Sequence, residues 1–506
     1  MLPLSTHAAG VPLTERSATE LAADLASGRV TAEALLAACL ERIEAVDRRG
    51  PKINSIIELN PDARAQAKAL DAERRAGKIR GALHGLPVLL KDNIATGDRM
   101  QTTAGSLALS GLHALRDAHV AAQLRAAGAV ILGKTNLSEW ANIRSTRSTS
   151  GWSGRGGLTR NPYALDRNCS GSSSGSAAAI AAELAPLAVG TETDGSVVSP
   201  ASICGVVGLK PTLGRVSRDG IIPIAHSQDT AGPMTRTVAD CALLFAAMCG
   251  KDSNDALTAD APAQAAWMPD ANALKGKRLG VARNYFTGYD EADAVIEAAI
   301  KRLAELGAVI VDPIDLPAVP YDDAELQVLL YELKADLVIW LKTFAPGHSI
   351  KTLADVIAFN KAHAKAEMPW FRQELFERAE ALGGLDTPAY LDALKESKEG
   401  AQANGLDKAM NAHKLDAIIA PTGGLAWLTD PIAADHYGAS FSTPAAVAGY
   451  PHLTVPAGLV HGLPLGLSFV GRAWSENLLL SLGYAFEQGT RARHRPRYLA
   501  NTRLLG

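Results

Sequence analysis

Three short segments combine serine hydroxyl groups with a lysine in a way that suits acyl transfer. Ser172 lies in a Gly/Ser-rich stretch, Ser196 ends the sequence Gly-Thr-Glu-Thr-Asp-Gly-Ser, and Lys91 follows an apolar run that begins at Gly85. A serine hydroxyl attacks a carbonyl carbon when a neighbouring base takes its proton, and burial lowers the pKa of a lysine so that its neutral amine can act as that base. The residue types therefore suit acyl transfer through a covalent intermediate on serine.

The expected elements bring the two serine loops together. The Gly/Ser stretch caps a helix over Ala177–Glu183, and Leu187–Gly190 is a short returning strand. A helix of about nine residues spans roughly 14 Å, and a strand of about five spans roughly 16 Å, so the chain returns close to where it began. We expect Ser172 and Ser196 to face each other, with Lys91 at the edge of the same sheet.

Helical and apolar stretches alternate along the chain, which indicates an α/β sheet core. Ser17 and Glu20 predict a capping box, and the helices from there to about Val46 predict a helical cover over about residues 1–75. The stretch 321–414 is mainly helical in pattern and is expected as an insertion over one side of the sheet. The predicted strands are Leu86–Leu90, Ala129–Leu132, Leu187–Gly190, Arg278–Ala282, Ala308–Val311, 415–420 and 464–470.

The composition is that of a globular protein and argues against several classes of partner. The 506 residues carry 50 Lys and Arg against 53 Asp and Glu, with no basic stripe interleaved with aromatic residues, so we expect no nucleic acid partner. No apolar run reaches the roughly 20 residues needed to cross a bilayer, so we expect no membrane partner. We expect a monomer or homodimer in the cytoplasm, or a secreted or periplasmic protein if a signal peptide was removed from a longer precursor.

Other motifs offer rival sites. Gly128-Ala-Val-Ile-Leu-Gly-Lys-Thr135 matches the P-loop pattern, but its central residues are an apolar, β-branched run that predicts a strand. Gly171-Ser-Ser-Ser-Gly175 matches the G-x-S-x-G elbow of a Ser-His-Asp site with Ser173 as nucleophile, yet no strand is predicted directly before it. Cys169 is another potential nucleophile, without an activating neighbour in the sequence. We expect all five cysteines to be inert, and no ligand spacing indicates a metal or other cofactor.

Together these segments resemble the amidase signature family. That family has a Gly/Ser-rich loop, then a G-T-x-x-G-G-S loop, then C-G-V-V-G-[FL]-K-P-T, which stands here as Cys204–Thr212. Gly190–Ser196 and the stretch Ser227-Gln-Asp-Thr-Ala-Gly-Pro-Met234 are most similar to the bacterial peptide amidase branch. The likeness runs from about Leu21 to Gly250 and resumes at 415–490, and it is strongest at Gly85–Ile94, Gly133–Asn142, Gly171–Ala178 and Gly190–Pro200.

The resemblance implies one α/β/α domain over residues 1–506, with a central mixed β-sheet covered by helices. It also implies that Ser196 attacks, that Ser172, in a cis peptide bond, relays the proton, and that Lys91 is the base. Asp194 replaces a glycine that is usual in the wider family, so its carboxylate is expected to point away from the oxyanion, and its role stays open. The backbone N–H groups at the family's oxyanion-binding positions are those of Thr193, Asp194, Gly195 and Ser196.

The predicted reaction is hydrolysis of a primary carboxamide to a carboxylate and ammonia, at the C-terminal amide of peptides as the resemblance implies. Trp140, Asn142 and Ser173 are expected near the small-molecule or peptide substrate. A broad aryl or alkyl acylamidase is the alternative within the family. Alternatives of another class are a noncatalytic subunit that binds an anion at helix N-termini and an amidotransferase-type subunit, which would need partner subunits.

Overall fold

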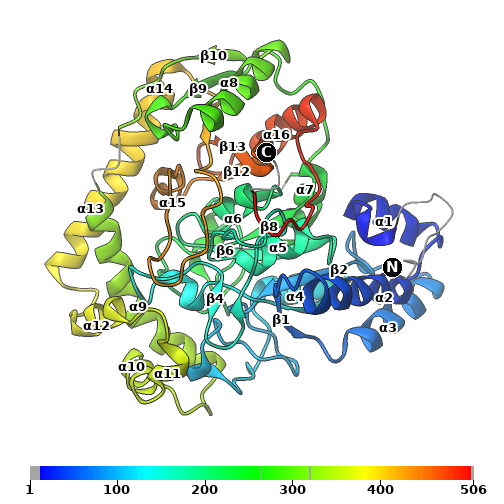
Figure 1. Cartoon of the computed structure of the whole chain (residues 1–506), viewed down its shortest axis with the longest axis vertical. Helices are drawn as coiled ribbons and strands as arrows, with labels where there is room; N and C mark the ends of the chain where they lie inside the picture. Colours follow the sequence, from blue (N-terminus) through cyan, green and yellow to red (C-terminus); the bar gives the residue numbers. More distant parts are fainter. Residues whose placement is uncertain (1–11, 264, 318–320, 503–506) are drawn as a thin grey trace.

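A computed structural model describes residues 12–263, 265–317 and 321–502, and it shows helices wrapped around a central β-sheet (Figure 1). The strands are β1 (Ile56–Leu59), β2 (Pro87–Lys91), β3 (Val130–Thr135), β4 (Trp152–Ser153), β5 (Gly157–Leu158), β6 (Leu187–Glu192), β7 (Val207–Lys210), β8 (Thr230–Thr235), β9 (Arg278–Val281), β10 (Val309–Val311), β11 (Ala417–Pro421), β12 (His452–Val460) and β13 (Leu463–Val470). The α-helices are α1 (Ala18–Ala26), α2 (Ala32–Arg42), α3 (Ala63–Arg75), α4 (His119–Ala126), α5 (Ser174–Ala181), α6 (Val198–Ile203), α7 (Val238–Met248), α8 (Asp290–Glu305), α9 (Asp322–Phe344), α10 (Leu353–Ala362), α11 (Ala364–Glu367), α12 (Glu374–Ala381), α13 (Pro388–Ala401), α14 (Asp407–His413), α15 (Thr443–Ala448) and α16 (Glu476–Thr490).

Eleven strands in the described ranges form one mixed sheet, in the order β1-β3-β2-β6-β8-β7-β12-β13-β11-β9-β10. Strands β3, β2 and β6 are parallel, and β8 joins β6 in the antiparallel direction. The three parallel strands are buried along their whole length, which explains why they appear in the sequence as continuous apolar runs. The expected α/β fold with a central mixed sheet is confirmed.

The P-loop match proves to be part of a strand. Gly133 and Lys134 lie inside β3, as the apolar run predicts, and not in a loop. The Lys134 ammonium is buried and donates to the carbonyl of Ile94 at 2.6 Å and to Thr102 Oγ1 at 3.1 Å. Its hydrogen bonds therefore hold a neighbouring loop and are not directed at a phosphate site.

Two groups of helices lie at opposite sides of the molecule. The predicted capping box is present, because the Ser17 side chain accepts from the Glu20 N–H and the Glu20 carboxylate accepts from the Ser17 N–H. Helices α1, α2 and α3 gather at one side of the molecule, whereas α9, α12 and α13 run along the other (Figure 1). No helix of the described ranges is both long enough and apolar enough to span a bilayer.

Alternate residues of strand β11 face two different hydrophobic cores. Ile419 belongs to the larger cluster of buried side chains and Ile418 to a second one. This alternation follows from strand geometry, because successive side chains point to opposite faces of a sheet. We call the cluster around Ile418, which includes Tyr285 and Phe441, the second core.

Candidate active site

Lys91 is completely buried at the end of strand β2 and is held by three hydrogen bonds. Its Nζ donates to Ser172 Oγ at 2.7 Å, to Thr191 Oγ1 at 2.9 Å and to the Thr191 carbonyl at 3.2 Å. Thr191 lies on β6, the parallel neighbour of β2, so the sheet itself places this partner beside the lysine. The structure brings Lys91 and Ser172 into direct contact and adds Thr191, which sequence reasoning did not single out.

The surroundings of Lys91 bring the pKa of its side chain close to neutral pH. Burial lowers the pKa of Lys91 to about 7, against the opposite effect of the carboxylates of Asp229 and Glu192. Both protonation states are then populated at pH 7. Such an amine can accept a proton and later return it.

The loop before helix α5 places Ser172 between Lys91 and the second serine loop. The peptide bond between Gly171 and Ser172 is cis. The Ser172 carbonyl accepts from the Ser138 N–H at 3.1 Å, and the Ser173 N–H donates to the Ser196 carbonyl at 3.1 Å. This last bond ties the two serine loops together, as expected from a helix and a strand of matching length.

Ser173 has a different environment from the other two serines. Its hydroxyl donates to the Thr191 carbonyl at 3.0 Å and accepts from the Thr191 N–H at 3.2 Å. The side chain is fully buried, and no strand runs directly into the turn that carries it. Ser173 therefore braces β6, and the geometry does not support a nucleophile elbow at this position.

Ser196 lies in the loop between β6 and α6 and reaches a cavity. Its exposed fraction is 8%, so the hydroxyl is accessible but sheltered. Within the described part of the chain, no hydrogen bond joins Ser172 Oγ to Ser196 Oγ, whereas the bond from Lys91 to Ser172 is formed. Hydrogen bonds among reacting groups are often long before substrate binds.

The loop that carries Ser196 is shaped by Glu192 and Gly195. The Glu192 carboxylate accepts from the N–H groups of Val197 at 2.7 Å and Val198 at 3.0 Å. Gly195 has a φ of 74°, and an added Cβ would lie 2.9 Å from Ser442 Oγ, so glycine suits this turn. The N–H groups of Gly195 and Ser196 have no hydrogen-bond acceptor among the described residues, and both residues line the cavity.

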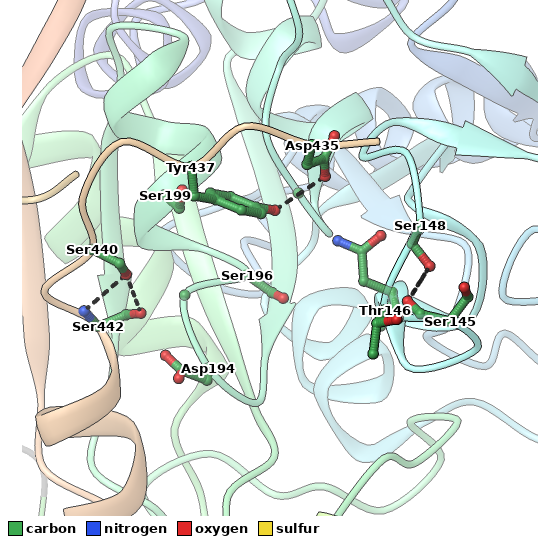
Figure 2. Close-up of a pocket in the computed structure, with 14 residues that line it drawn as sticks. Ser145, Thr146, Ser148, Asp194, Ser196, Ser199, Asp435, Tyr437, Ser440 and Ser442 are labelled. Carbon is green, nitrogen blue, oxygen red and sulfur yellow. Dashed lines mark hydrogen bonds between the residues drawn. The ribbon is translucent and has the colours of Figure 1, made fainter. Parts of the chain in front are cut away.

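Asp194 lies in the same loop, with its carboxylate turned from the Ser196 hydroxyl. Its Oδ2 accepts from Thr443 Oγ1, at the start of helix α15, at 2.6 Å. Figure 2 shows the Asp194 carboxylate and the Ser196 hydroxyl pointing to opposite sides of the loop. The carboxylate thus links the loop to α15.

The cavity over Ser196 has a volume of about 470 Å³, which lies within the roughly 300–1,000 Å³ typical of small-molecule sites (Figure 2). Its described lining residues include two carboxylates, Asp194 and Asp435, and no lysine, arginine or histidine. Most of the others are serine or threonine. The lining therefore offers hydrogen bonds and negative charge but no positive side chain to an anionic substrate.

One wall of the cavity comes from residues 424–442, which we call the wall segment. Asp435 accepts twice from the Ser150 N–H, at 3.1 and 3.0 Å, and once from Trp427 Nε1 at 3.2 Å. The Tyr437 hydroxyl lies 3.0 Å from Ser150 Oγ. The contacts with Ser150 join residues 285 or more positions apart, so no local pattern in the sequence could have indicated them.

Of the expected substrate contacts on the loop after β3, Asn142 lines the cavity and Trp140 does not. Asn142 Nδ2 donates to Ser150 Oγ at 3.0 Å, and its Oδ1 has no partner among the described residues. Trp140 is only 2% exposed and packs edge-on against Phe376, with 5.6 Å between ring centroids. The expectation for Trp140 is corrected: its large apolar ring is buried behind the cavity wall.

The cysteines and the potential metal ligands lie outside this arrangement. All five cysteines are free, and burial raises the pKa of Cys169 well above its usual value, so its thiol stays protonated. Among the described residues, His226, Glu332 and Asp336 form a potential metal-ligand group. The imidazole Nδ1 faces Asp336 at 2.9 Å and Nε2 faces Glu332 at 3.4 Å, so the ring bridges two carboxylates as an ion pair.

The fold and the site define an α/β enzyme in which a buried lysine contacts a serine loop next to a cavity. The family model described as Amidase matches residues 34–480. The chain belongs to the amidase family. The expected family and an amide-hydrolysing activity are thereby confirmed.

Individual relatives cover nearly the whole chain. The native peptide amidase from Stenotrophomonas maltophilia is 51% identical with a TM-score of 0.92, covering 96% of this chain and 99% of that chain. A probable amidase of Arabidopsis thaliana is 40% identical over 475 residues, which are 90% of this chain and 87% of the relative. A glutamyl-tRNA(Gln) amidotransferase subunit of Roseiflexus castenholzii is 36% identical over 502 residues, which are 95% of this chain and 96% of the relative.

Proposed function

We propose that the protein hydrolyses the C-terminal amide of peptides to a carboxylate and ammonia, with Ser196 as nucleophile. The observation that carries this proposal is the 2.7 Å hydrogen bond between the buried Lys91 ammonium and Ser172 Oγ, beside the loop of Ser196. An amide has a poor leaving group, so the attacking hydroxyl must lose a proton and the departing nitrogen must gain one. A lysine that shuttles between its two protonation states meets both needs.

In the proposed reaction the proton moves in two directions. Neutral Lys91 takes the proton of Ser172 as Ser172 takes that of Ser196, and Ser196 Oγ forms a bond to the amide carbon. The proton then returns along the same path to the leaving nitrogen, the C–N bond breaks, and ammonia departs. Water, deprotonated through the same relay, hydrolyses the acyl-enzyme and regenerates Ser196.

The oxyanion that develops during attack needs fixed donors. We assign this role to the backbone N–H groups of residues 193–196, and the unoccupied N–H groups of Gly195 and Ser196 at the cavity support it. The position of the Asp194 carboxylate, held by Thr443, keeps its charge away from these donors. Asn142 is the proposed contact to the acyl part, because its side chain lines the cavity and its Oδ1 has no protein partner in the described ranges.

The substrate class rests on the likeness to the Stenotrophomonas maltophilia peptide amidase together with the uncharged, hydroxyl-rich part of the cavity lining. We expect purified protein to release ammonia faster from a peptide amide than from free glutamine, and faster than it releases aniline from an anilide. Ser196→Ala should lose at least about 1,000-fold in turnover, as loss of a nucleophile does. Cys169→Ala is the matched control for the rival nucleophile and should retain turnover.

Other outcomes would point to the alternatives. A preference for the anilide would favour a broad acylamidase, and a preference for glutamine would favour the amidotransferase role of the Roseiflexus relative. Turnover that persists in Ser196→Ala would reject the proposed nucleophile. Absence of turnover on all three substrates would favour a noncatalytic role.

A further inference from the structure

Asp229 is a buried carboxylate that connects two loops near the site. It directly precedes strand β8, and its exposed fraction is 7%. Its Oδ1 accepts from Thr193 Oγ1 at 2.5 Å, and its Oδ2 accepts from the N–H groups of Ile224 at 2.8 Å and Ala225 at 3.0 Å. A carboxylate with three donors at these distances is fixed in place.

The contact with Thr193 reaches the start of the loop that carries Ser196. Thr193 follows β6 directly, and the loop residues after it line the cavity. Its carbonyl also accepts from Gln228 Nε2 at 3.3 Å, and the same amide donates to Glu325 of helix α9 at 2.7 Å. Thr193 is therefore held at its side chain and at its backbone by the two residues before β8, which fixes the direction in which the loop leaves the sheet.

The same carboxylate acts on Lys91 through space. Of the charges that raise the pKa of Lys91, Asp229 is the larger and Glu192 the smaller, and both oppose the effect of burial. Glu192 itself faces the buried ammonium of Lys210, which offsets part of its charge. The other charged groups that face Asp229 are Arg218 and Asp336.

We propose that Asp229 is a positioning residue of the reaction, which holds Thr193 so that the following N–H groups face the cavity and which adds negative charge to the surroundings of Lys91. This inference rests on the proposed function, because it assumes that Lys91 is the base. Asp229 does not line the Ser196 cavity and has no contact with Ser172 or Ser196 among the described residues. It acts through Thr193 and through its charge.

The two roles separate in a set of variants measured by pH profiles of kcat/KM and by kcat. Asp229→Asn and Asp229→Ser remove the charge, so the pKa of Lys91 falls. The acid limb of the profile, which is the rise of kcat/KM with increasing pH, then moves to lower pH by roughly half a unit or more. This shift is smaller than the shift expected on removing a charge in direct contact with Lys91. Asp229→Glu keeps the charge and should keep the acid limb in place.

The Thr193 variants test the positioning role. Thr193→Val loses the hydroxyl but leaves the charge of Asp229 in place, so kcat should fall roughly 10- to 100-fold while the acid limb does not move. Thr193→Ser keeps a hydroxyl and should restore kcat. Asp219→Asn, which removes a carboxylate paired with Arg116, is the control for a change in net charge.

Each result supports or overturns one role. An acid limb that stays in place in whichever charge-free variant folds, or that moves equally in Asp219→Asn, overturns the electrostatic role. Equal kcat values for Thr193→Val and Thr193→Ser overturn the positioning role. Lys91→Met and Ser196→Ala are measured alongside. Turnover that persists in these two variants would overturn the proposed function itself. If both lose turnover while the variants at positions 193 and 229 behave like the wild type, only the present inference is overturned.

Discussion

At the scale of single residues, the proposed reaction depends on the protonation state of Lys91. A lysine in water is charged at neutral pH and holds its proton too tightly to be a base. Burial at the end of β2 removes water from the ammonium, while Ser172 and Thr191 accept its hydrogen bonds. An amine in this environment can accept a proton at neutral pH, so the proposed relay of Lys91, Ser172 and Ser196 needs no histidine.

The pH dependence of turnover follows from the pKa of about 7 for Lys91. Below that pH the amine is protonated and cannot accept a proton, so kcat/KM should rise as pH passes through about 7 and then level off. Lys91→Arg keeps a cation that does not lose its proton, so kcat/KM should fall roughly 100- to 10,000-fold at every pH. A pH profile of the purified variants tests this.

The matched control is Lys134→Arg, because Lys134 is also fully buried but bonds to Ile94 and Thr102 instead of the serine loops. The kcat/KM of Lys134→Arg, calculated for the folded fraction of the protein, should rise over the same pH range as that of the wild type. Near-normal turnover in Lys91→Arg would contradict the assignment of the base.

At the scale of elements, a buried group of charges joins the loop after β3 to the helical region. Arg144 Nη1 lies 2.7 Å from Glu139 Oε1 and 3.8 Å from Glu367 Oε2, and none of the three side chains is exposed. Glu367 ends helix α11. Two carboxyl groups thus share one guanidinium, and burial, the largest influence, raises the pKa of Glu139 well above its usual value.

This raised pKa makes stability depend on pH. Because the folded-state pKa of Glu139 exceeds the unfolded-state value, the folded protein binds the extra proton, and stability falls as pH rises from about 4.5 towards the folded-state pKa. The slope is at most about 1.4 kcal/mol per pH unit for one proton. Glu139→Gln mimics the protonated form and should flatten the decline of Tm between pH 5 and 8. A decline as steep as in the wild type would show that another group carries it.

The sequence predicts those elements whose patterns are local. Strands β2, β3 and β6 were expected from apolar runs because both of their faces are covered. Strands β8 and β12 were not, because Gly232 and Pro233 in β8 and Pro456 and Gly458 in β12 are residues that usually weaken a strand. Their place in the sheet is decided by neighbours far away in the sequence, and the same holds for the wall segment of the cavity.

At the scale of the whole molecule, the second core supports the cavity from behind. Phe441 lies near the end of the wall segment, packs against Tyr285 with 4.8 Å between ring centroids, and is fully buried. The next residues, Ser442 and Thr443, approach Gly195 and Asp194 in the loop that carries Ser196. Packing in the second core is therefore linked to the loop that carries Ser196.

We expect Phe441→Ala to cost about 3–5 kcal/mol and to impair the site before the chain unfolds. Turnover should decline on heating at a temperature below the loss of helical circular dichroism. Phe245→Ala in helix α7 removes an equally buried ring from the larger core and is the matched control. In Phe245→Ala, turnover and helical signal should disappear together on heating. If they also disappear together in Phe441→Ala, the connection between the second core and the loop that carries Ser196 is contradicted.

The cavity is assembled from two parts of the chain that are independent in sequence. The proposed reacting groups all come from residues 91–196, on or next to strands β2 and β6, whereas the wall segment comes from residues 424–442 between β11 and α15. Mutations in the part of this segment that precedes Phe441 can change which substrates the cavity accepts without altering the residues of the proposed proton path. This division of the cavity offers an engineer a place to introduce new selectivity while the proposed reacting groups stay unchanged.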